Sequence, residues 1–177
     1  IFSFNGNKLI TTGAGGLIVT KNKVIEKKIR HLISQSKIKK KFDIYSNELG
    51  FNLKMNALCA SLGIAQLKKI KKILKSKRKI FNYYKSKFKH SSEIKLICSK
   101  EKQIPNHWIN TIMFKNINKK KRDYILKRLN SKGLESKPIW YPIHKMKSYR
   151  NFPKMNLRNS EVAYIKCINI PNTEKKY

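Results

Sequence analysis

Lys8 stands out among the residues of this 177-residue chain because of what surrounds it. A lysine amine that is withdrawn from water adds to an aldehyde and forms an imine, which is a route to covalent catalysis. Lys and Arg together number 42, so composition alone does not single out one lysine. Ser3 precedes Lys8, and a glycine cluster follows it at Gly13, Gly15 and Gly16. Because a β-rich run follows these glycines, we expect a backbone turn and not a phosphate-binding loop at a helix start.

The elements next to Lys8 follow from local patterns. Residues 16–20 are short, apolar and β-rich, which predicts a buried strand. Asn22 is expected to cap an amphipathic helix that ends near Gln35. The basic and polar residues 37–50 then predict a loop.

A long helix is expected to connect this region to the rest of the chain. Asn56 would cap it, and its apolar and lysine-rich sides run towards Phe88, with a break near residues 76–79 because of its length. Further on, Gly133 is expected to follow a helix C-cap, and Pro138 to place its strand at a sheet edge. The remaining elements are predicted as two strands, a helix, a strand and a helix, at residues 94–98, 107–115, 118–129, 135–140 and 159–167, before residues 168–171. This order predicts a small α/β layer distinct from the first segment.

Three segments carry a resemblance to a known family. Residues 2–16, FSFNGNKLITTGAGG, strongly resemble the segment around the Schiff-base lysine in the DegT/DnrJ/EryC1/StrS family of pyridoxal-phosphate (PLP)-dependent sugar aminotransferases. Residues 48–56, ELGFNLKMN, and the helix after them are similar to a second family segment; the helix residues that carry the likeness are Ala60, Gly63, Ala65, Gln66 and Leu67. Residues 137–144, KPIWYPIH, look like the family's substrate-facing segment.

The chain departs from the family pattern at three positions. Most members carry an acidic residue where this chain has Ala14, and a tyrosine where it has Phe51. Lys54 stands for the usual arginine, which keeps the charge but loses the planar fork that binds phosphate through two hydrogen bonds.

The resemblance implies an α/β chain that represents the C-terminal part of a type I PLP-dependent transferase fold. Residues 1–55 would be the end of the large cofactor-binding domain, residues 56–88 a long connecting helix, and residues 89–177 the small C-terminal α/β domain. The N-terminal half of the usual enzyme would be missing. Because that half supplies an aspartate and a ring-stacking aromatic to the cofactor, the 177 residues alone are expected to be inactive or barely active.

The resemblance also assigns roles to individual residues. Lys8 would be the catalytic, cofactor-linked lysine, and Ser3 would donate its hydroxyl to the cofactor phosphate. Asn52 would reach the phosphate of the neighbouring subunit, which implies a homodimer. Substrate contacts are expected from Lys54, Trp140 and His144. The side chains of Trp140 and His144 remain open to purely structural roles as an edge aromatic and a hydrogen-bonding histidine.

The implied reaction moves an amino group from an amino acid, expected to be glutamate, to the 4-keto carbon of a nucleotide-linked deoxysugar. The wording SFNGNK is close to the branch that aminates UDP-linked 4-keto sugars on the bacillosamine and legionaminic acid pathways. Relatives that use the cofactor for sugar dehydration replace the lysine with histidine, so Lys8 disfavours that branch.

The net charge of +33 raises a second class of function, a basic module that binds nucleic acid or an anionic surface. The helix at residues 56–88 would carry that binding. Against it, lysines are spread along the whole chain, and no zinc-finger spacing or paired metal-ligand spacing occurs. No apolar run approaches the roughly 20 residues of a membrane span. We therefore expect a cytoplasmic enzyme with no metal, no specific nucleic acid and no membrane partner.

Overall fold

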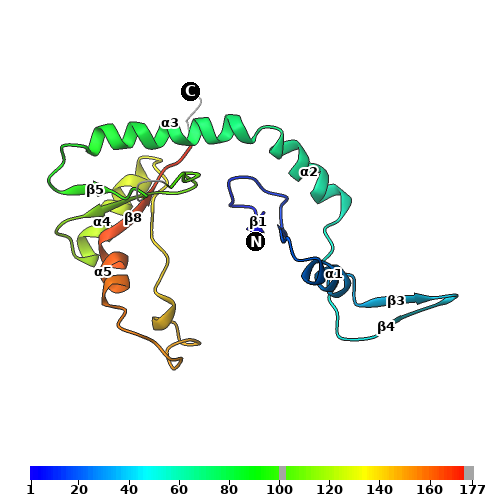
Figure 1. Ribbon diagram of the computed structural model, residues 1–177. Helices are drawn as coiled ribbons and strands as arrows, with labels where there is room; N and C mark the ends of the chain where they lie inside the picture. The colour runs from blue at the N-terminus through cyan, green and yellow to red at the C-terminus, as the bar shows by residue number, and fades with distance from the viewer. Residues whose placement is uncertain (100–102, 174–177) are drawn as a thin grey trace. The chain divides into compact units, whose positions relative to one another are not determined.

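The structure, a computed structural model, describes residues 1–99 and 103–173 and divides the chain into two compact units (Figure 1). The first unit is Ile1–Lys71, and the second begins at Lys72. Helix α3, Ile70–Phe88, starts in the first unit and continues in the second. The domain boundaries predicted after residues 55 and 88 stay a prediction, because they refer to the longer fold of the family that the sequence resembles.

The first unit contains two short sheets and two helices, and both of its predicted helix caps are confirmed. The Asn22 side chain accepts hydrogen bonds from the first backbone amides of α1, and the Asn56 side chain does the same for Cys59 N at the start of α2. The long helix is broken at residues 68–69, so the predicted break at residues 76–79 was wrong. The elements are β1 Phe2–Ser3, β2 Gly16–Leu17, α1 Lys23–Leu32, β3 Lys37–Lys40, β4 Asp43–Ser46 and α2 Ala57–Leu67.

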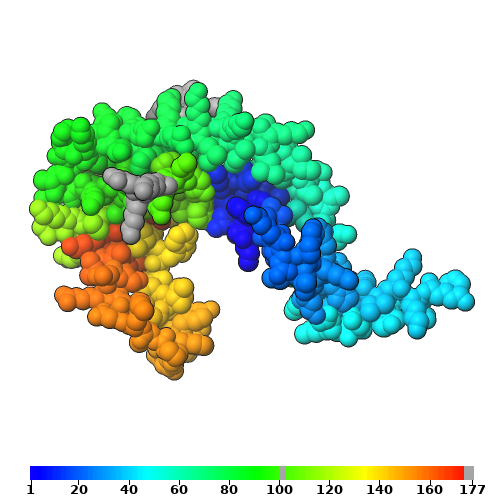
Figure 2. Space-filling view, viewed as in Figure 1, coloured from blue at the N-terminus to red at the C-terminus, as the bar shows by residue number. Residues whose placement is uncertain are grey.

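Two predictions for this unit were wrong. The strand predicted at residues 16–20 is only Gly16–Leu17, and it is exposed, because it pairs with β1 alone among the described residues. The predicted loop contains the antiparallel hairpin of β3 and β4, which turns at Lys41 with φ 51°. Figure 2 shows this hairpin, in light blue, as an arm that extends from the rest of its unit. Its four lysines masked the alternation that normally reveals a strand.

The second unit is built on a four-stranded antiparallel sheet with the order β5-β6-β8-β7. The predicted α/β layer is confirmed, with β7 at a sheet edge as expected from Pro138. Gly133, at φ 73°, follows the C-cap residue Lys132 of α4, as predicted. The elements after α3 are β5 Ile94–Leu96, β6 Asn110–Phe114, α4 Lys119–Ser131, β7 Lys137–Pro138, the 3-10 helix η1 Ile143–Lys145, α5 Arg158–Lys166 and β8 Cys167–Ile170.

The hydrophobic core lies on one face of this sheet. Leu96, Ile112 and Ile168 are partners on adjacent strands, so their side chains share a face. Helices α3 and α4 pack partly buried side chains against it, from Phe81, Tyr84, Phe88, Ile125 and Leu129. In the described chain every buried hydrophobic residue belongs to this unit, whereas the buried residues of the first unit are the polar Thr12 and Ser36. The first unit is therefore held mainly by hydrogen bonds and partly buried side chains.

None of the described helices combines the length and the apolar character needed to cross a bilayer.

Candidate active site

Lys8 sits at the tip of a loop whose base is closed by backbone hydrogen bonds. Phe4 N donates to Gly15 O at 2.9 Å, and Thr12 N donates to Phe4 O at 3.0 Å. Within the loop, Lys8 N donates to Asn5 O at 3.0 Å and forms a turn. The loop thus presents Lys8, which is half-buried, on a defined backbone.

Ser3 lies at the start of the same loop and is exposed. Its hydroxyl oxygen accepts a long hydrogen bond of 3.5 Å from Asn5 N. The Ser3 oxygen is the acceptor in that bond, so the hydroxyl hydrogen does not take part in it. The sequence-predicted pair of amine and hydroxyl therefore belongs to one local structure.

The glycine cluster has a steric purpose, in agreement with the predicted backbone turn. A Cβ atom at Gly16 would lie 2.7 Å from Phe2 O. This distance is too short for a non-bonded contact, so a side chain at position 16 would disrupt the pairing of β1 with β2. Gly13 and Gly15 have φ angles of 83° and 104°, in the region that favours glycine. At Gly15 a Cβ atom would also approach Met55 Cε to 3.0 Å. The turn is consequently packed against the segment that leads into α2.

Asn52 and Lys54 lie on a different segment of the same unit, and both are exposed. The segment is paired with the end of α1 through Phe51 N to Leu32 O at 2.7 Å and Leu53 N to Ile33 O at 3.0 Å. This pairing fixes the backbone at Asn52 while its side chain remains accessible.

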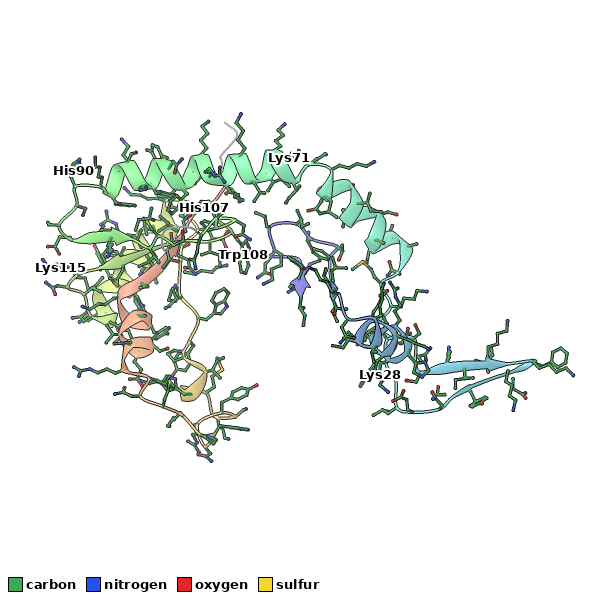
Figure 3. All side chains as sticks on the ribbon, viewed as in Figure 1. Lys28, Lys71, His90, His107, Trp108 and Lys115 are labelled. Atoms are coloured by element: carbon green, nitrogen blue, oxygen red, sulfur yellow. The ribbon has the colours of Figure 1, made fainter. Side chains whose placement is uncertain are left out.

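Ion pairs that the sequence did not predict join α1 to the residues before this segment. Lys28, labelled in Figure 3, contacts Glu48 at 2.6 Å, and His31 Nε2 lies 2.7 Å from Asn47 Oδ1. The hydrogen bond from Lys28 holds the pKa of the Glu48 carboxyl below its usual value. The family-like string ELGFN is thereby anchored at its first residue.

Trp140 and His144 lie in the second unit and line one open cleft of about 800 Å³. This volume falls in the range of small-molecule sites. Trp140 is 69% exposed, and its ring lies 6.2 Å from that of Trp108. Three further aromatic side chains line the cleft, from Tyr141, Tyr149 and Phe152. The cleft can therefore offer stacking surfaces to a planar or apolar group.

His144 is held by a carboxylate of α5. Its Nε2 lies 3.0 Å from Glu161 Oε1, and Lys145 Nζ lies 2.8 Å from Glu161 Oε2. Helix α5 is itself fixed by the buried Arg122, whose guanidinium donates to the Tyr164 carbonyl and lies 4.7 Å from the Tyr164 ring. The lysine-rich composition gave no sign that this one arginine is buried.

We expect the Glu161 pair to weaken in acid. Hydrogen bonds from Lys145 and then from His144 lower the pKa of the Glu161 carboxyl. A folded-state pKa below the unfolded value stabilises the fold above the unfolded pKa, and this contribution is lost as pH falls through the folded pKa. A ¹³C NMR titration should give a Glu161 midpoint below that of an ordinary glutamate, and Lys145→Ala should raise it. A Glu161 midpoint equal to that of an ordinary glutamate, and unchanged in Lys145→Ala, would contradict the pairing of Glu161 with Lys145.

The basic-module alternative receives no support from these contacts. An exposed Lys8 would have favoured this alternative, and Lys8 is half-buried. On the lysine-rich helix α3, Lys77 donates to the Asn172 carbonyl, and the desolvation that accompanies its burial lowers the pKa of its amine. Lys77 therefore makes its hydrogen bond within the fold, although it belongs to the lysine-rich helix.

Comparison with known proteins gives a match along almost the whole chain. The model of the DegT/DnrJ/EryC1/StrS aminotransferase family matches residues 1–175. GDP-perosamine synthase of Vibrio cholerae is 30% identical over 174 residues, which cover 97% of this chain and 46% of that protein. The chain therefore spans about half the length of the curated relatives it matches.

Solved structures agree with the sequence match. Helicobacter pylori PseC, an aminotransferase involved in the biosynthesis of pseudoaminic acid, superposes with a TM-score of 0.88 at 25% identity, over 96% of this chain and 46% of PseC. The PLP-form of Spr1654 from Streptococcus pneumoniae superposes with a TM-score of 0.86 at 20% identity, over 99% of this chain and 47% of Spr1654. These likenesses confirm the predicted α/β architecture as part of the type I fold.

Proposed function

This chain belongs to the DegT/DnrJ/EryC1/StrS aminotransferase family, and from that premise we propose that it supplies the lysine-bearing part of a nucleotide-sugar aminotransferase. The observation that carries the proposal is the position of Lys8, half-buried on a loop that closes on itself and also carries Ser3. The string at residues 2–16, which resembles the family segment around the Schiff-base lysine, contains no other lysine.

The residues of the loop fit PLP. A primary amine, a hydroxyl with its hydrogen to spare and a tight glycine turn suit an aldehyde that carries a phosphate. Ser3 would hold the phosphate of PLP, and Lys8 would hold its aldehyde carbon. When bound, PLP supplies an electron sink for the α-carbon of an amino acid. Lys8 Nζ would take up the proton that leaves the α-carbon of the amino donor.

Asn52 and Lys54 contribute to an active site shared between two subunits of a homodimer. Support comes from the backbone pairing that fixes this segment and from the exposure of both side chains. Asn52 donates its amide hydrogens to the phosphate bound by the neighbouring subunit. Lys54 contacts the nucleotide substrate as a single positive charge, and it lacks the bidentate hydrogen bonding of an arginine.

The substrate we propose is a 4-keto deoxysugar linked to a nucleotide, with glutamate as amino donor, in the cytoplasm. Trp140 and His144 contact this substrate from their cleft, whose aromatic lining supports binding of a planar base. The SFNGNK wording favours UDP, whereas the Vibrio cholerae relative is named for a GDP sugar. UDP-linked and GDP-linked 4-keto sugars should therefore be compared directly.

The test is transamination by the 177-residue chain with PLP, glutamate and each 4-keto sugar nucleotide, followed by product mass. We expect PLP to bind at Lys8 and turnover to be very slow, because the relatives are about twice as long as this chain. Efficient turnover by these residues alone would contradict the proposal that further residues complete the site. Absence of any PLP bound at Lys8 would overturn the aminotransferase proposal itself.

A further inference from the structure

Gln66 of α2 makes two hydrogen bonds to the backbone of a single residue in the Lys8 loop. Thr11 N donates to Gln66 Oε1 at 3.0 Å, and Gln66 Nε2 donates to Thr11 O at 2.8 Å. The side-chain amide therefore pairs with Thr11 as a neighbouring strand would, with one donor and one acceptor. The two residues are 55 positions apart, so this contact joins segments that are distant in the sequence.

Thr11 is the residue on which the loop closes. Its Oγ1 donates to Phe4 O at 2.8 Å and accepts from Gly13 N at 2.9 Å. Phe4 lies on one side of Lys8 in the sequence, and Thr11 and Gly13 lie on the other. A constraint on Thr11 is therefore passed to both ends of the segment that carries Lys8.

Helix α2 touches the loop at a second point, one turn before Gln66. Thr12 is only 3% exposed, and a Cβ atom at Gly63 would lie 2.9 Å from Thr12 Cγ2. Gly63 and Gln66 are three residues apart and share one face of the helix. This face therefore presses on Thr12 and holds Thr11 at the same time.

The chemistry of this contact requires a glutamine. The bonded groups are part-buried, and a peptide group left unpaired in such a place costs about 1–3 kcal/mol. Glutamine carries a donor and an acceptor on one planar amide at any ordinary pH, and asparagine, which does the same, is one methylene shorter. Glutamate in its charged form would keep the acceptor but set an oxygen against Thr11 O.

We propose that Gln66 is the positioning residue for Lys8. It holds the Lys8 loop on α2 through Thr11, so that the amine is presented to the aldehyde carbon of PLP in one orientation. This inference rests on the proposed function of Lys8. Gln66 itself contacts neither the cofactor nor the reacting atoms.

The first test measures the contact without any cofactor. Hydrogen exchange of the Thr11 amide should be at least about fivefold faster in Gln66→Ala than in the wild type, as expected for the loss of a net hydrogen bond. Gln66→Glu should lose part of the protection at neutral pH, because its charged carboxylate repels Thr11 O, and should recover it in acid, where a protonated carboxyl again offers one donor and one acceptor. Ser61→Ala, at an exposed site on the same helix, is the matched control and should exchange as the wild type does at each pH.

The second test measures the fraction of Lys8 converted to the phosphopyridoxyl derivative by PLP and borohydride at a fixed time. Gln66→Ala should lower it at least about fivefold, and Gln66→Glu should regain it in acid together with Thr11 protection. Unchanged Lys8 conversion in a variant that has lost Thr11 protection would overturn the positioning role alone. Lost conversion with full Thr11 protection would overturn it too. A wild-type chain without selective conversion of Lys8 would instead overturn the proposed function on which the inference rests.

Discussion

Lys8→Ala is expected to lower roughly tenfold the amount of PLP that borohydride fixes to the chain at equimolar cofactor. The other lysines form imines with free PLP only transiently and without a fixed geometry. Lys8 differs because its loop is closed at Phe4 and held on α2, so its amine meets the aldehyde already oriented. The measurement is the absorbance and mass of the reduced chain after removal of free cofactor.

Two variants separate the chemistry from the charge. Lys8→Arg retains a positive charge but cannot form the imine, so it should lose as much fixed PLP as Lys8→Ala. Lys21→Ala removes an exposed lysine elsewhere in the same unit and should leave the yield within experimental error. A yield that falls equally in the Lys21 and Lys8 variants would show that Lys8 has no special role.

Gly50→Ala is expected to destabilise the first unit by about 2–3 kcal/mol, the upper part of the usual range for a side chain forced into a filled site. A Cβ atom there would lie 2.4 Å from both Gln35 C and Ser36 N, and these are backbone atoms. Gln35 and Ser36 already have φ angles of 66° and 50°, so this turn has little freedom to move away. The clash would separate the end of α1 from the segment that carries Asn52.

Hydrogen exchange of the Gln35, Phe51 and Leu53 amides is the direct measurement, because these amides form the pairing that the clash breaks. Gly6→Ala is the matched control, since a Cβ atom at Gly6 would meet only Gly13 O at 3.8 Å. We expect Gly6→Ala to change exchange at these amides by less than about 0.5 kcal/mol. Equal effects of the two substitutions would contradict the packing described for Gly50.

Features set by neighbouring residues could be predicted from the sequence. Asn22, Asn56 and Asn118 each cap the helix that was expected to follow them. Gly133 and Pro138 also have the expected positions, because a left-handed cap and an edge strand are signalled locally. The predicted order of strands and helices as far as α5 is also confirmed, whereas β8 was not predicted as a strand and the order of the strands in the sheet was not predicted.

Features set by distant contacts could not be predicted. The hairpin of β3 and β4 was missed because its lysines hide the strand pattern, and the break before Ile70 has no proline or glycine to mark it. The contact between Gln66 and Thr11 spans too many residues for any local pattern to reveal. For the site, the motif around Lys8 identified the amine, but the residue that holds its loop became evident only from the fold.

The most direct test of the central claim is to locate the PLP that borohydride fixes to the wild-type chain. Proteolysis and mass spectrometry would give the fraction of each lysine modified at equimolar cofactor. We predict that most of the modification lies on the peptide that contains Lys8. Modification spread over the lysines in proportion to their exposure would contradict the claim.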